Sequence, residues 1–583
     1  MSNQSVEEIK ISSIGLRGTL AETLQSEATH FSDEEYQLLK FHGSYQQDDR
    51  DIRAERRKQK LDKLWSFMIR SKMPGGRINA AQYLMHDRLA GDVANGTLRL
   101  TTRQGIQFHG VFKGDLKEVI AGICESGLTT WGACGDVVRN TMGPASPIHD
   151  VAHRDCQALA EEMSAVFLPR SSAYSEIWLD GEKLELSSGK AEPDEIYGET
   201  YLPRKFKIGM AVPPRNDVDI FSQDVGMVPH VNAAGDAVEG YSIWVGGGFG
   251  MTHNMEHTRP HLAKPLCYAA RADVLAVVKA VVQVQREHGN RTDRKLSRLK
   301  YVVAGQGIEW FRDRVAEKLP GVTLAPVREV RFTTVGDRLG WHEQGDGNWF
   351  RGFHVPQGRI LDVEGGTRFR TAFREAAEQF GKPYVVTPNA NLILCDVAES
   401  EKAAIDALFA QHLFPNDEAY TEARKTGHAC VALPTCGLSL AESERVFTGL
   451  LDDVDRVLHD LGLEREPLLI RMTGCPNGCA RPYNADIAFV GRAPKKYAMY
   501  VGGSCAGDRL AGLFRRTVEF HEIPEVIRGL LVDFVKDRHE GETFTAYWGR
   551  TQEAGEEPDA LHFHKELVER TARLEGTKTT AAE

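Results

Sequence analysis

Residues 76–111 read GRINAAQYLMHDRLAGDVANGTLRLTTRQGIQFHGV, and residues 358–397 read GRILDVEGGTRFRTAFREAAEQFGKPYVVTPNANLILCDV. Both segments open on Gly-Arg-Ile and have the pattern of a short strand, an amphipathic helix and a returning strand. Fainter echoes follow in the same order, with VVRNTMGP and LPRKFKIGMAVPP answered by HACVALPTCGL and RMTGCPNGCAR. Solenoid repeats are only about 20 to 50 residues long. The long period instead predicts a tandem duplication with two pseudo-symmetric halves, and such interfaces often hold large ligands.

The composition is that of a large globular chain, with 583 residues of which 42% are hydrophobic, enough for two to four packed units. No run approaches the roughly 18 apolar residues of a membrane span, and MSNQSVEEIK at the start has no signal-peptide pattern. We therefore expect a cytoplasmic protein with no membrane partner. The net charge of −11 gives no global support for a nucleic-acid partner, which needs a basic face.

Four of the ten cysteines form two close pairs, Cys430-x5-Cys436 and Cys475-x3-Cys479, set among turn residues. Ten cysteines are too few for a secreted disulfide scaffold of this length. Four thiolates are what a [4Fe-4S] cluster requires. A structural zinc site is one alternative, although zinc ribbons usually pair their ligands as C-x2-C. A non-enzymatic iron-sulfur carrier or redox sensor is another.

The segments around these cysteines, ALPTCGLSLAESER and RMTGCPNGCAR, closely resemble the cluster-binding pair of the sulfite and nitrite reductase haemoproteins. FHGSYQQDDRDIRAER, RLTTRQGIQFHGV, YLPRKFKIGMAVPP, VGGG and HGNRTDRKLSRLKY resemble other landmarks of that family, in the same order. The resemblance implies that Cys430, Cys436, Cys475 and Cys479 ligate a [4Fe-4S] cluster. It also implies that Cys479 bridges this cluster to the iron of a sirohaem.

The resemblance implies an α+β fold with pseudo-twofold duplicated halves, made of ferredoxin-like half-domains and two sirohaem-binding α/β lobes. The charge run QQDDRDIRAERRKQK is typical of a solvated helix or arm. The boundaries that we expect are an N-terminal arm at 1–55, a ferredoxin-like half-domain at 56–120, a sirohaem-binding lobe at 121–330, a second half-domain at 331–405, and a lobe for sirohaem and cluster at 406–583.

A protein of net negative charge that buries sirohaem, which carries eight carboxylates in this family, must gather Arg and Lys around it. In TLRLTTRQGIQFHG, the alternation of a strand puts Arg99, Arg103 and His109 on one face, opposite an apolar face. A solvent-exposed basic face is the alternative, above all for Arg99. With the family resemblance, all three are candidate cofactor contacts, and Arg103 and His109 are the better supported.

The same alternation in YLPRKFKIGMAVPP puts Lys205 and Lys207 together while Phe206 faces away. Two adjacent ammonium groups repel one another and so favour an anion between them, although lysines that guard an exposed strand edge follow the same pattern. The resemblance implies a sulfite pocket made of Arg70, Arg139, Lys205 and Lys207. Related nitrite reductases tend to lack the second lysine, so Lys207 favours sulfite over nitrite.

The resemblance implies further sirohaem contacts outside these strands, although the basic segment at 290–300 also reads as a solvated helix or loop. The residues concerned are Arg204, Asn290, Arg291, Lys300 and Asn477.

The activity that the resemblance implies is the six-electron reduction of sulfite to hydrogen sulfide in sulfate assimilation and cysteine biosynthesis, with sirohaem-dependent nitrite reduction as the alternative. No G-x-G-x-x-G follows a predicted strand and opens a helix, so the electrons must come from a partner. An NADPH-dependent flavoprotein subunit is favoured because YQQDDRDIRAER and LPRKFK resemble that bacterial type. Ferredoxin is the alternative donor.

Overall fold

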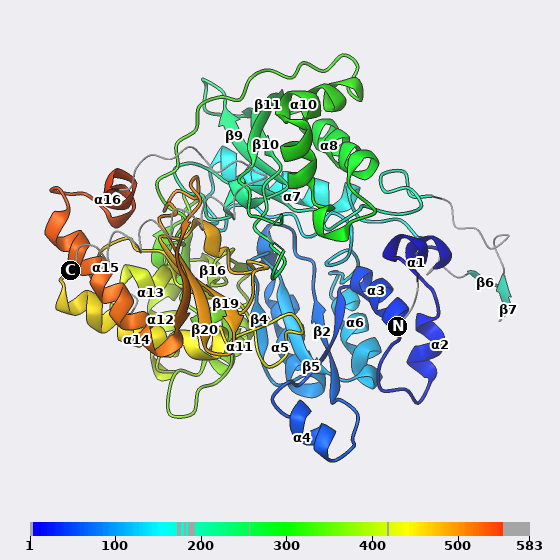
Figure 1. Cartoon of the computed structure of the whole chain (residues 1–583), viewed down its shortest axis with the longest axis horizontal. Helices are drawn as coiled ribbons and strands as arrows, with labels where there is room; N and C mark the ends of the chain where they lie inside the picture. Colours follow the sequence, from blue (N-terminus) through cyan, green and yellow to red (C-terminus); the bar gives the residue numbers. More distant parts are fainter. Residues whose placement is uncertain are drawn as a thin grey trace.

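The computed structural model describes residues 4–171, 177–179, 182–184, 193–255, 257–416 and 419–551. Two sheets of corresponding strands lie at the centre of the molecule, and a further sheet with its own helices lies on each of two sides (Figure 1). Within the described ranges, no helix combines the length and the apolar character that crossing a bilayer requires.

The two central sheets have equivalent strand orders and are built from corresponding segments of the two halves. The first has the order β1-β2-β5-β4-β14, and the second has the order β12-β13-β16-β15-β3. Helices α5 and α11 pack against each other across the centre. The bounds are β1 (Ser44–Asp48), β2 (Trp65–Arg70), β3 (Arg77–Ile78), α5 (Ala80–Val93), β4 (Leu98–Leu100), β5 (Ile106–Val111) and α6 (Leu116–Glu125), then β12 (Gly340–Glu343), β13 (Trp349–Phe353), β14 (Arg359–Ile360), α11 (Phe369–Phe380), β15 (Tyr384–Val386), β16 (Leu392–Val397) and α12 (Lys402–Gln411).

The echoed segments exchange their first strands, so that each half completes the sheet of the other. Strand β14 pairs with β4, with Arg359 opposite Arg99. Strand β3 pairs with β15, with Ile78 opposite Tyr384. The duplication predicted from the echo is therefore present in the fold, and the two halves share one core.

Gly76 and Gly358 open the two exchanged strands in backbone conformations that favour glycine, with φ values of +78° and +70°. A Cβ at Gly76 would strike the carbonyl oxygen of Val386, and one at Gly358 would lie 2.8 Å from the Cβ of Ala390. The repeated Gly-Arg-Ile therefore marks a crossing that is too tight for a side chain.

Two of the three remaining sheets form the flanking lobes. One has the order β11-β10-β9-β8 and the other the order β17-β18-β19-β20-β21. The bounds in the first lobe are α7 (Val151–Val166), β8 (Ile208–Met210), β9 (Val225–Val231), β10 (Val238–Val245), β11 (Lys264–Ala270), α8 (Val274–His288), α9 (Leu299–Gln306) and α10 (Ile308–Glu317), with a separate hairpin of β6 (Ile177–Leu179) and β7 (Glu182–Leu184). Those in the second are α13 (Glu422–Thr426), β17 (His428–Ala429), α14 (Glu444–Asp460), β18 (Ile470–Thr473), β19 (Ile487–Ala493), β20 (Lys496–Val501), β21 (Gly512–Glu519), α15 (Ile523–Asp537) and α16 (Phe544–Thr551).

The single strand predicted across 97–110 is wrong, because this segment folds as a hairpin. Strands β4 and β5 pair antiparallel with Arg99 opposite Gln107, and the turn between them places Gln104 at a φ of +51°. The predicted alternation holds within each strand, so Arg99 and Gln107 share a face. Arg103 instead leaves from the turn, which the local alternation could not indicate.

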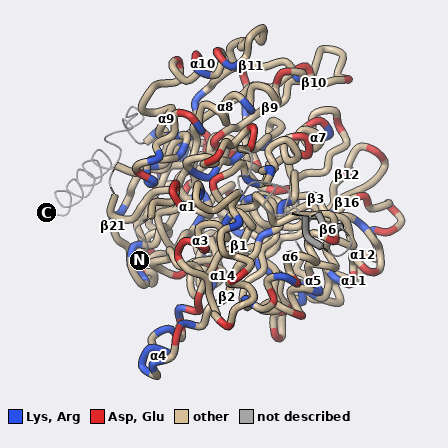
Figure 2. Tube along the Cα trace, turned by 90° about the vertical axis from the view of Figure 1, so that its right-hand side faces the viewer, with Lys and Arg blue, Asp and Glu red and all other residues tan. Residues whose placement is uncertain are grey.

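Most of the segment expected as an N-terminal arm folds against the body of the protein. Helices α1 (Val6–Ser12), α2 (Leu20–Gln25) and α3 (Asp33–Leu39) precede β1, which pairs with β2 as an edge strand. Leu16 and Phe31 are at most 1% exposed. The basic helix α4 (Arg53–Lys58) projects from the surface with none of its residues buried (Figures 1 and 2).

Candidate functional site

The two cysteine pairs leave the same edge of one sheet. Cys430 directly follows β17, and Cys475 follows β18 after one residue. Because β17 and β18 are parallel neighbours, the segments that continue from their carboxyl ends begin side by side. The Cys430 N–H donates to the Met472 carbonyl at 3.2 Å, which ties the two segments together.

The four thiols lie within electrostatic range of one another. Burial raises the pKa of Cys430 well above its usual range, and Cys479, Cys475 and Cys436 act in the same direction. Burial, followed by Cys479, raises the pKa of Cys475 to about 12. The Gly474 N–H donates to the Cys430 sulfur at 3.3 Å. A cationic metal centre would remove the repulsion that these thiolates otherwise exert on one another.

The thiols fit a polynuclear cluster better than a single zinc ion. A tetrahedral zinc site draws four sulfurs to about 2.3 Å from one point. In the part of the chain that the structure describes, no three His, Cys, Asp or Glu side chains are arranged to hold one metal ion. A [4Fe-4S] cluster instead takes one thiolate at each of four iron atoms, so its ligands need not converge on one point.

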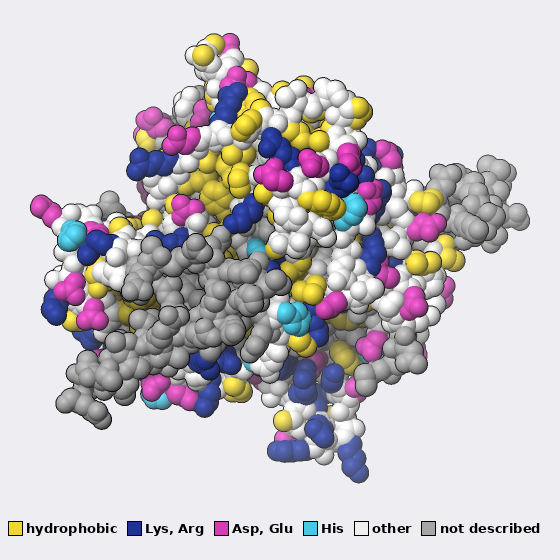
Figure 3. Space-filling model, turned by 45° about the horizontal axis from the view of Figure 1, so that its top comes forward, with side chains coloured by type: hydrophobic (Ala, Val, Ile, Leu, Met, Phe, Trp, Pro, Cys, Tyr) yellow, Lys and Arg dark blue, Asp and Glu magenta, His cyan; other side chains and the backbone are white. Residues whose placement is uncertain are grey.

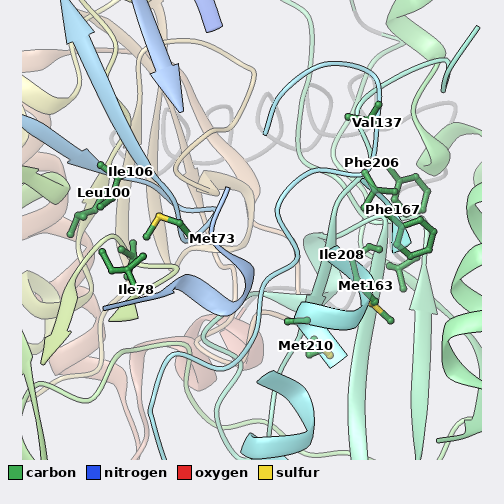
Figure 4. Packing of buried hydrophobic residues seen from close by; sticks show 14 of the residues in the cluster. Met73, Ile78, Leu100, Ile106, Val137, Met163, Phe167, Phe206, Ile208 and Met210 are labelled. Atoms are coloured by element: carbon green, nitrogen blue, oxygen red, sulfur yellow. The ribbon is translucent and has the colours of Figure 1, made fainter. Parts of the chain in front are cut away.

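A second group of residues, which we call the cation pocket, is built by the segment 204–207 and the loop that carries Arg139. The Arg139 N–H donates to the Phe206 carbonyl and the Phe206 N–H donates to the Val137 carbonyl, each at 3.0 Å. Figure 4 shows Phe206 turned towards Phe167 in the apolar core, near Val137. With Phe206 held there, Lys205 and Lys207 are turned to the other side.

The cations of this pocket converge strongly enough to shift one another. Burial lowers the pKa of Lys205 to about 7, followed by the effects of Arg139 and Arg298. Burial also lowers the pKa of Lys207 well below its usual range, and Lys205 is the next cause. Cys479 opposes the shift of Lys205. The cation pocket and the cysteine site are therefore neighbours, as one site for a joined sirohaem and cluster requires.

Two predicted residues present buried nitrogens to this region without a partner among the described residues. They are Nε of Arg103 and Nδ1 of His109. The other Arg103 nitrogens donate to Gln223, at 2.6 Å, and to the Asn140 carbonyl. Unsatisfied buried nitrogens are costly, and carboxylates of a bound macrocycle would satisfy them. The pocket therefore fits the anionic group that the sequence predicted.

Arg70 reaches the same region from the end of β2. Its Nη1 donates to the Cys134 sulfur at 3.2 Å, and its Nε donates at 2.9 Å to Gln107 when that amide is oriented to accept. Arg139 donates to the Tyr45 hydroxyl at 3.3 Å. Both guanidiniums are held by neutral partners, so each retains its charge for an anion.

Lys300, Arg204 and Asn477 lie close to the two sites. The Lys300 ammonium donates to backbone carbonyls of the glycine-rich loop, including that of Gly250 at 2.8 Å. Burial lowers the pKa of Arg204 to about 10, followed by Arg294. The Asn477 amide donates to the Cys475 sulfur at 3.6 Å.

Three predicted cofactor contacts are engaged elsewhere. Arg99 pairs with Glu444 at 3.0 Å and is 3% exposed. Asn290 accepts three hydrogen bonds within its own turn, from Thr292 and Asp293. Arg291 pairs with Glu7 of α1. These side chains serve ion pairs or a turn in the structure. Their sequence positions alone could not show this for the two arginines, because local sequence does not reveal a distant partner.

Sequence reasoning missed a buried pair that borders the cation pocket. Arg298 and Asp224 are bonded at 2.8 Å, with side chains 8% and 0% exposed. Asp224 Oδ2 also accepts from the Lys207 N–H at 2.9 Å. Arg298 lies in the basic segment quoted for the family resemblance. The sequence signal for its partner was Asp224, the lone acidic residue in FSQDVG.

A separate cavity of about 520 Å³ lies between residues 144–161 and parts of the second half, and none of the predicted site residues lines it. Arg77 and Asp396, both on its wall, are paired across the two halves at 2.7 Å. We assign it no role in the chemistry.

Comparison with known proteins shows which family has this architecture. The family model described as the nitrite/sulfite reductase ferredoxin-like half domain matches residues 61–126 and 342–412, and the model described as the nitrite and sulphite reductase 4Fe-4S domain matches residues 160–322. A protein of Staphylococcus saprophyticus named sulfite reductase (NADPH) hemoprotein beta-component is 43% identical over 560 residues, covering 96% of this chain and 97% of the relative. The chain belongs to the nitrite and sulfite reductase family.

A second relative and a solved structure match over a similar extent. A Methylobacterium nodulans protein with the same name is 46% identical over 540 residues, covering 92% of this chain and 89% of that protein. The solved structure of Mycobacterium tuberculosis NirA matches with a TM-score of 0.76 and 22% identity, covering 95% of this chain and 97% of the other. The predicted α+β fold with duplicated halves is therefore confirmed. The four cysteines lie outside the matched family ranges, so their assignment rests on the geometry above.

Proposed function

We propose that this chain is the haemoprotein component of an assimilatory sulfite reductase, which reduces sulfite to hydrogen sulfide with sirohaem and a [4Fe-4S] cluster. The observation that carries the proposal is the contiguity of the two sites: the Thr102 hydroxyl donates to the Cys479 carbonyl at 3.2 Å, and the next residue, Arg103, donates to the carbonyl of Asn140, which follows Arg139. A zinc protein or a simple electron carrier needs no such pocket. The relatives' names support the same activity.

The residues divide into two sets. Cys430, Cys436, Cys475 and Cys479 would hold the cluster, and Cys479, the exposed thiol among the four, would also serve the sirohaem. Carboxylates of the macrocycle would be held by the basic residues around the cation pocket, Arg103, His109, Arg204 and Lys300. When bound, these groups supply the electrons, which protein side chains cannot.

The cation pocket binds the oxyanion and moves protons. Arg70 and Arg139 donate hydrogen bonds to sulfite oxygens, which fixes the orientation of the anion. Lys205, with a pKa near 7, gives a proton to an oxygen as the S–O bond breaks and regains it near neutral pH. Lys207 lies beside Lys205 and relays the next proton, so each oxygen leaves as water.

The donor that we propose is an NADPH-dependent flavoprotein subunit, with ferredoxin as the alternative, and the location is the cytoplasm. Helix α4 carries Arg53, Arg56, Arg57 and Lys58 on a projection that Figure 3 shows at the bottom, whereas the rest of that face mixes charges. Arg50, at the base of this projection, donates to the carbonyl of Cys436 at 3.0 Å. An acidic donor surface docked there would lie close to the cluster.

The test gives the cofactor-loaded protein a reduced dye and supplies sulfite or nitrite in parallel, and it measures the sulfide and ammonia released. We expect sulfide at low sulfite. Lys207→Gln should lower kcat/KM for sulfite by about 100-fold, the size of losing one charge-stabilising donor, and should affect nitrite less. Lys536→Gln, exposed on α15, is the control. Ammonia without sulfide would establish nitrite reduction instead. If neither sulfide nor ammonia forms, the proposal is overturned.

A further inference from the structure

The N-terminal helix α1 inserts a lysine into the back of the cation pocket. The side chain of Lys10 is 1% exposed and lies 3.2 Å from Asp136. Its ammonium also donates to Glu7, at 2.6 Å, and to the carbonyl of Leu202, at 3.0 Å. A buried ammonium is costly unless several acceptors surround it. An apolar residue would hold a short helix on a core at lower cost, so the geometry of these contacts calls for another explanation.

The explanation lies in residues 201–203, the segment to which Lys10 donates its hydrogen bond. Three successive carbonyls, those of residues 201, 202 and 203, are each held by a different cation. Arg291 donates to Tyr201 at 2.7 Å, Lys10 donates to Leu202, and Arg294 donates to Pro203 at 3.3 Å. Residues 204–207, which carry the cations of the pocket, follow without a break. The position of residues 204–207 is therefore determined by α1 and by the segment 291–294, which hold the carbonyls of the three preceding residues.

Asp136 joins the network to the other wall of the pocket. It pairs with Arg294 at 2.8 Å and with Lys10, and its carbonyl accepts from the Leu202 N–H at 3.0 Å. Although burial opposes it, Lys10 and then Arg294 hold the pKa of Asp136 well below its usual range. Asp136 lies three residues before Arg139, so the same charged network supports both walls.

We propose that α1, through Lys10, is a positioning element of the oxyanion pocket, which sets the spacing of Lys205 and Lys207 against Arg139. Lys10 touches neither substrate nor cofactor in this role and acts through the carbonyl of Leu202 and the carboxylate of Asp136. The inference rests on the proposed function for its substrate, sulfite, and deepens it by naming what orders the site. A displacement of reacting groups by about 1 Å can cost a large factor in rate or affinity.

The test is Lys10→Met in the full-length, cofactor-loaded protein. We expect KM for sulfite to rise about tenfold with a smaller change in kcat, and hydrogen exchange at residues 202–207 to accelerate. The iron and sirohaem contents should not change. Lys113→Met is the matched control, because half-buried Lys113 also donates to two backbone carbonyls of the N-terminal region, those of Thr23 and Ser26, away from the pocket. This control should alter neither KM for sulfite nor hydrogen exchange at residues 202–207.

Glu7→Gln is a milder second variant, since Glu7 contacts both Lys10 and Arg291; it should move KM and exchange in the same direction by a smaller factor. An unchanged KM together with unchanged exchange at 202–207 would overturn the proposal. So would a loss of kcat that merely follows lost cofactor, because that indicates a structural role. If the wild-type protein reduces no sulfite, the proposed function fails, while the exchange comparison still decides whether α1 orders the segment.

Discussion

Lys205 and Lys207 are separated by one residue whose side chain is anchored in the core. Phe206 is 1% exposed, and its burial turns both ammonium groups into a space that already holds Arg139 and Arg298. Alternation predicted that the two lysines share a face. Alternation could not predict their lowered pKa values, because these result from burial and from guanidiniums that other parts of the chain bring close.

Anion binding should depend on pH through Lys205. With a pKa of about 7, its ammonium is lost as the pH rises above 7, so affinity for an anion should fall by up to about tenfold per pH unit, with proton uptake on binding. Nitrite is the suitable probe, since its charge is constant in this range. Calorimetric titration of the loaded protein from pH 6 to 9 measures both effects. Lys205→Gln should bind more weakly and lose the slope, and a slope that survives this substitution would contradict the assignment.

Helix α14 begins at a carboxylate that connects the central sheet to the cluster segment. Glu444 bonds Arg99 of β4 at 3.0 Å and Arg359 of β14 at 2.7 Å. Its N–H donates to the Cys430 carbonyl at 3.0 Å, and Arg99 donates to the Ala429 carbonyl at 2.8 Å. Both arginines belong to the exchanged strand pair, so the joint between the halves also supports the first cluster ligand.

Glu444→Ala should destabilise this joint by about 3 to 5 kcal/mol, because it leaves two buried guanidiniums without their anion. Glu444→Gln, which keeps the shape and an acceptor, should cost less. The midpoint of chemical denaturation measures the change, and iron content reports whether the Cys430 segment is disturbed. Glu525→Ala, at a carboxylate 84% exposed on α15, is the control and should stay within about 0.5 kcal/mol of the wild type. Equal effects of Glu444→Ala and the control would contradict the role.

The whole molecule buries several histidines in the neutral form. Burial lowers the pKa of His86 and of His354 to about 4 in each case. His86 lies between the Gln82 carbonyl, at 2.7 Å, and the Ser71 hydroxyl, at 3.1 Å. Such groups contribute stability that is fully present above the unfolded pKa of about 6.5 and is lost as the pH falls through the folded value.

The folded state should therefore weaken between pH 6.5 and 4, by up to about 3 kcal/mol for each histidine. The unfolded chain binds protons in this window and the folded chain does not. Denaturation midpoints measured from pH 8 to 4 give the dependence. His86→Gln should reduce the slope, since one fewer group then distinguishes the two states. A midpoint that stays constant down to pH 4 would exclude this account.

The sequence by itself determined the duplication and the two close cysteine pairs, because each depends on local period, spacing or glycine position, whereas the α+β class followed from the family resemblance. Gly76 and Gly358 illustrate this, since a tight crossing leaves a visible glycine. Which cations face the ligand was decided only by the tertiary structure. Arg99 and Arg291 carry the same charge as Arg103, yet their partners Glu444 and Glu7 lie hundreds of residues away.

The pairing partners of β3 and β14 and the insertion of Lys10 likewise have no local signal. Strand order depends on which backbone edges meet after the halves pack, and hydrogen bonds of this kind are formed by any residue type. The cost of burying a charge depends on acceptors that arrive from other parts of the chain. Local pattern therefore specifies elements and ligand types, whereas long-range packing selects which charges are neutralised and which remain available for an anion.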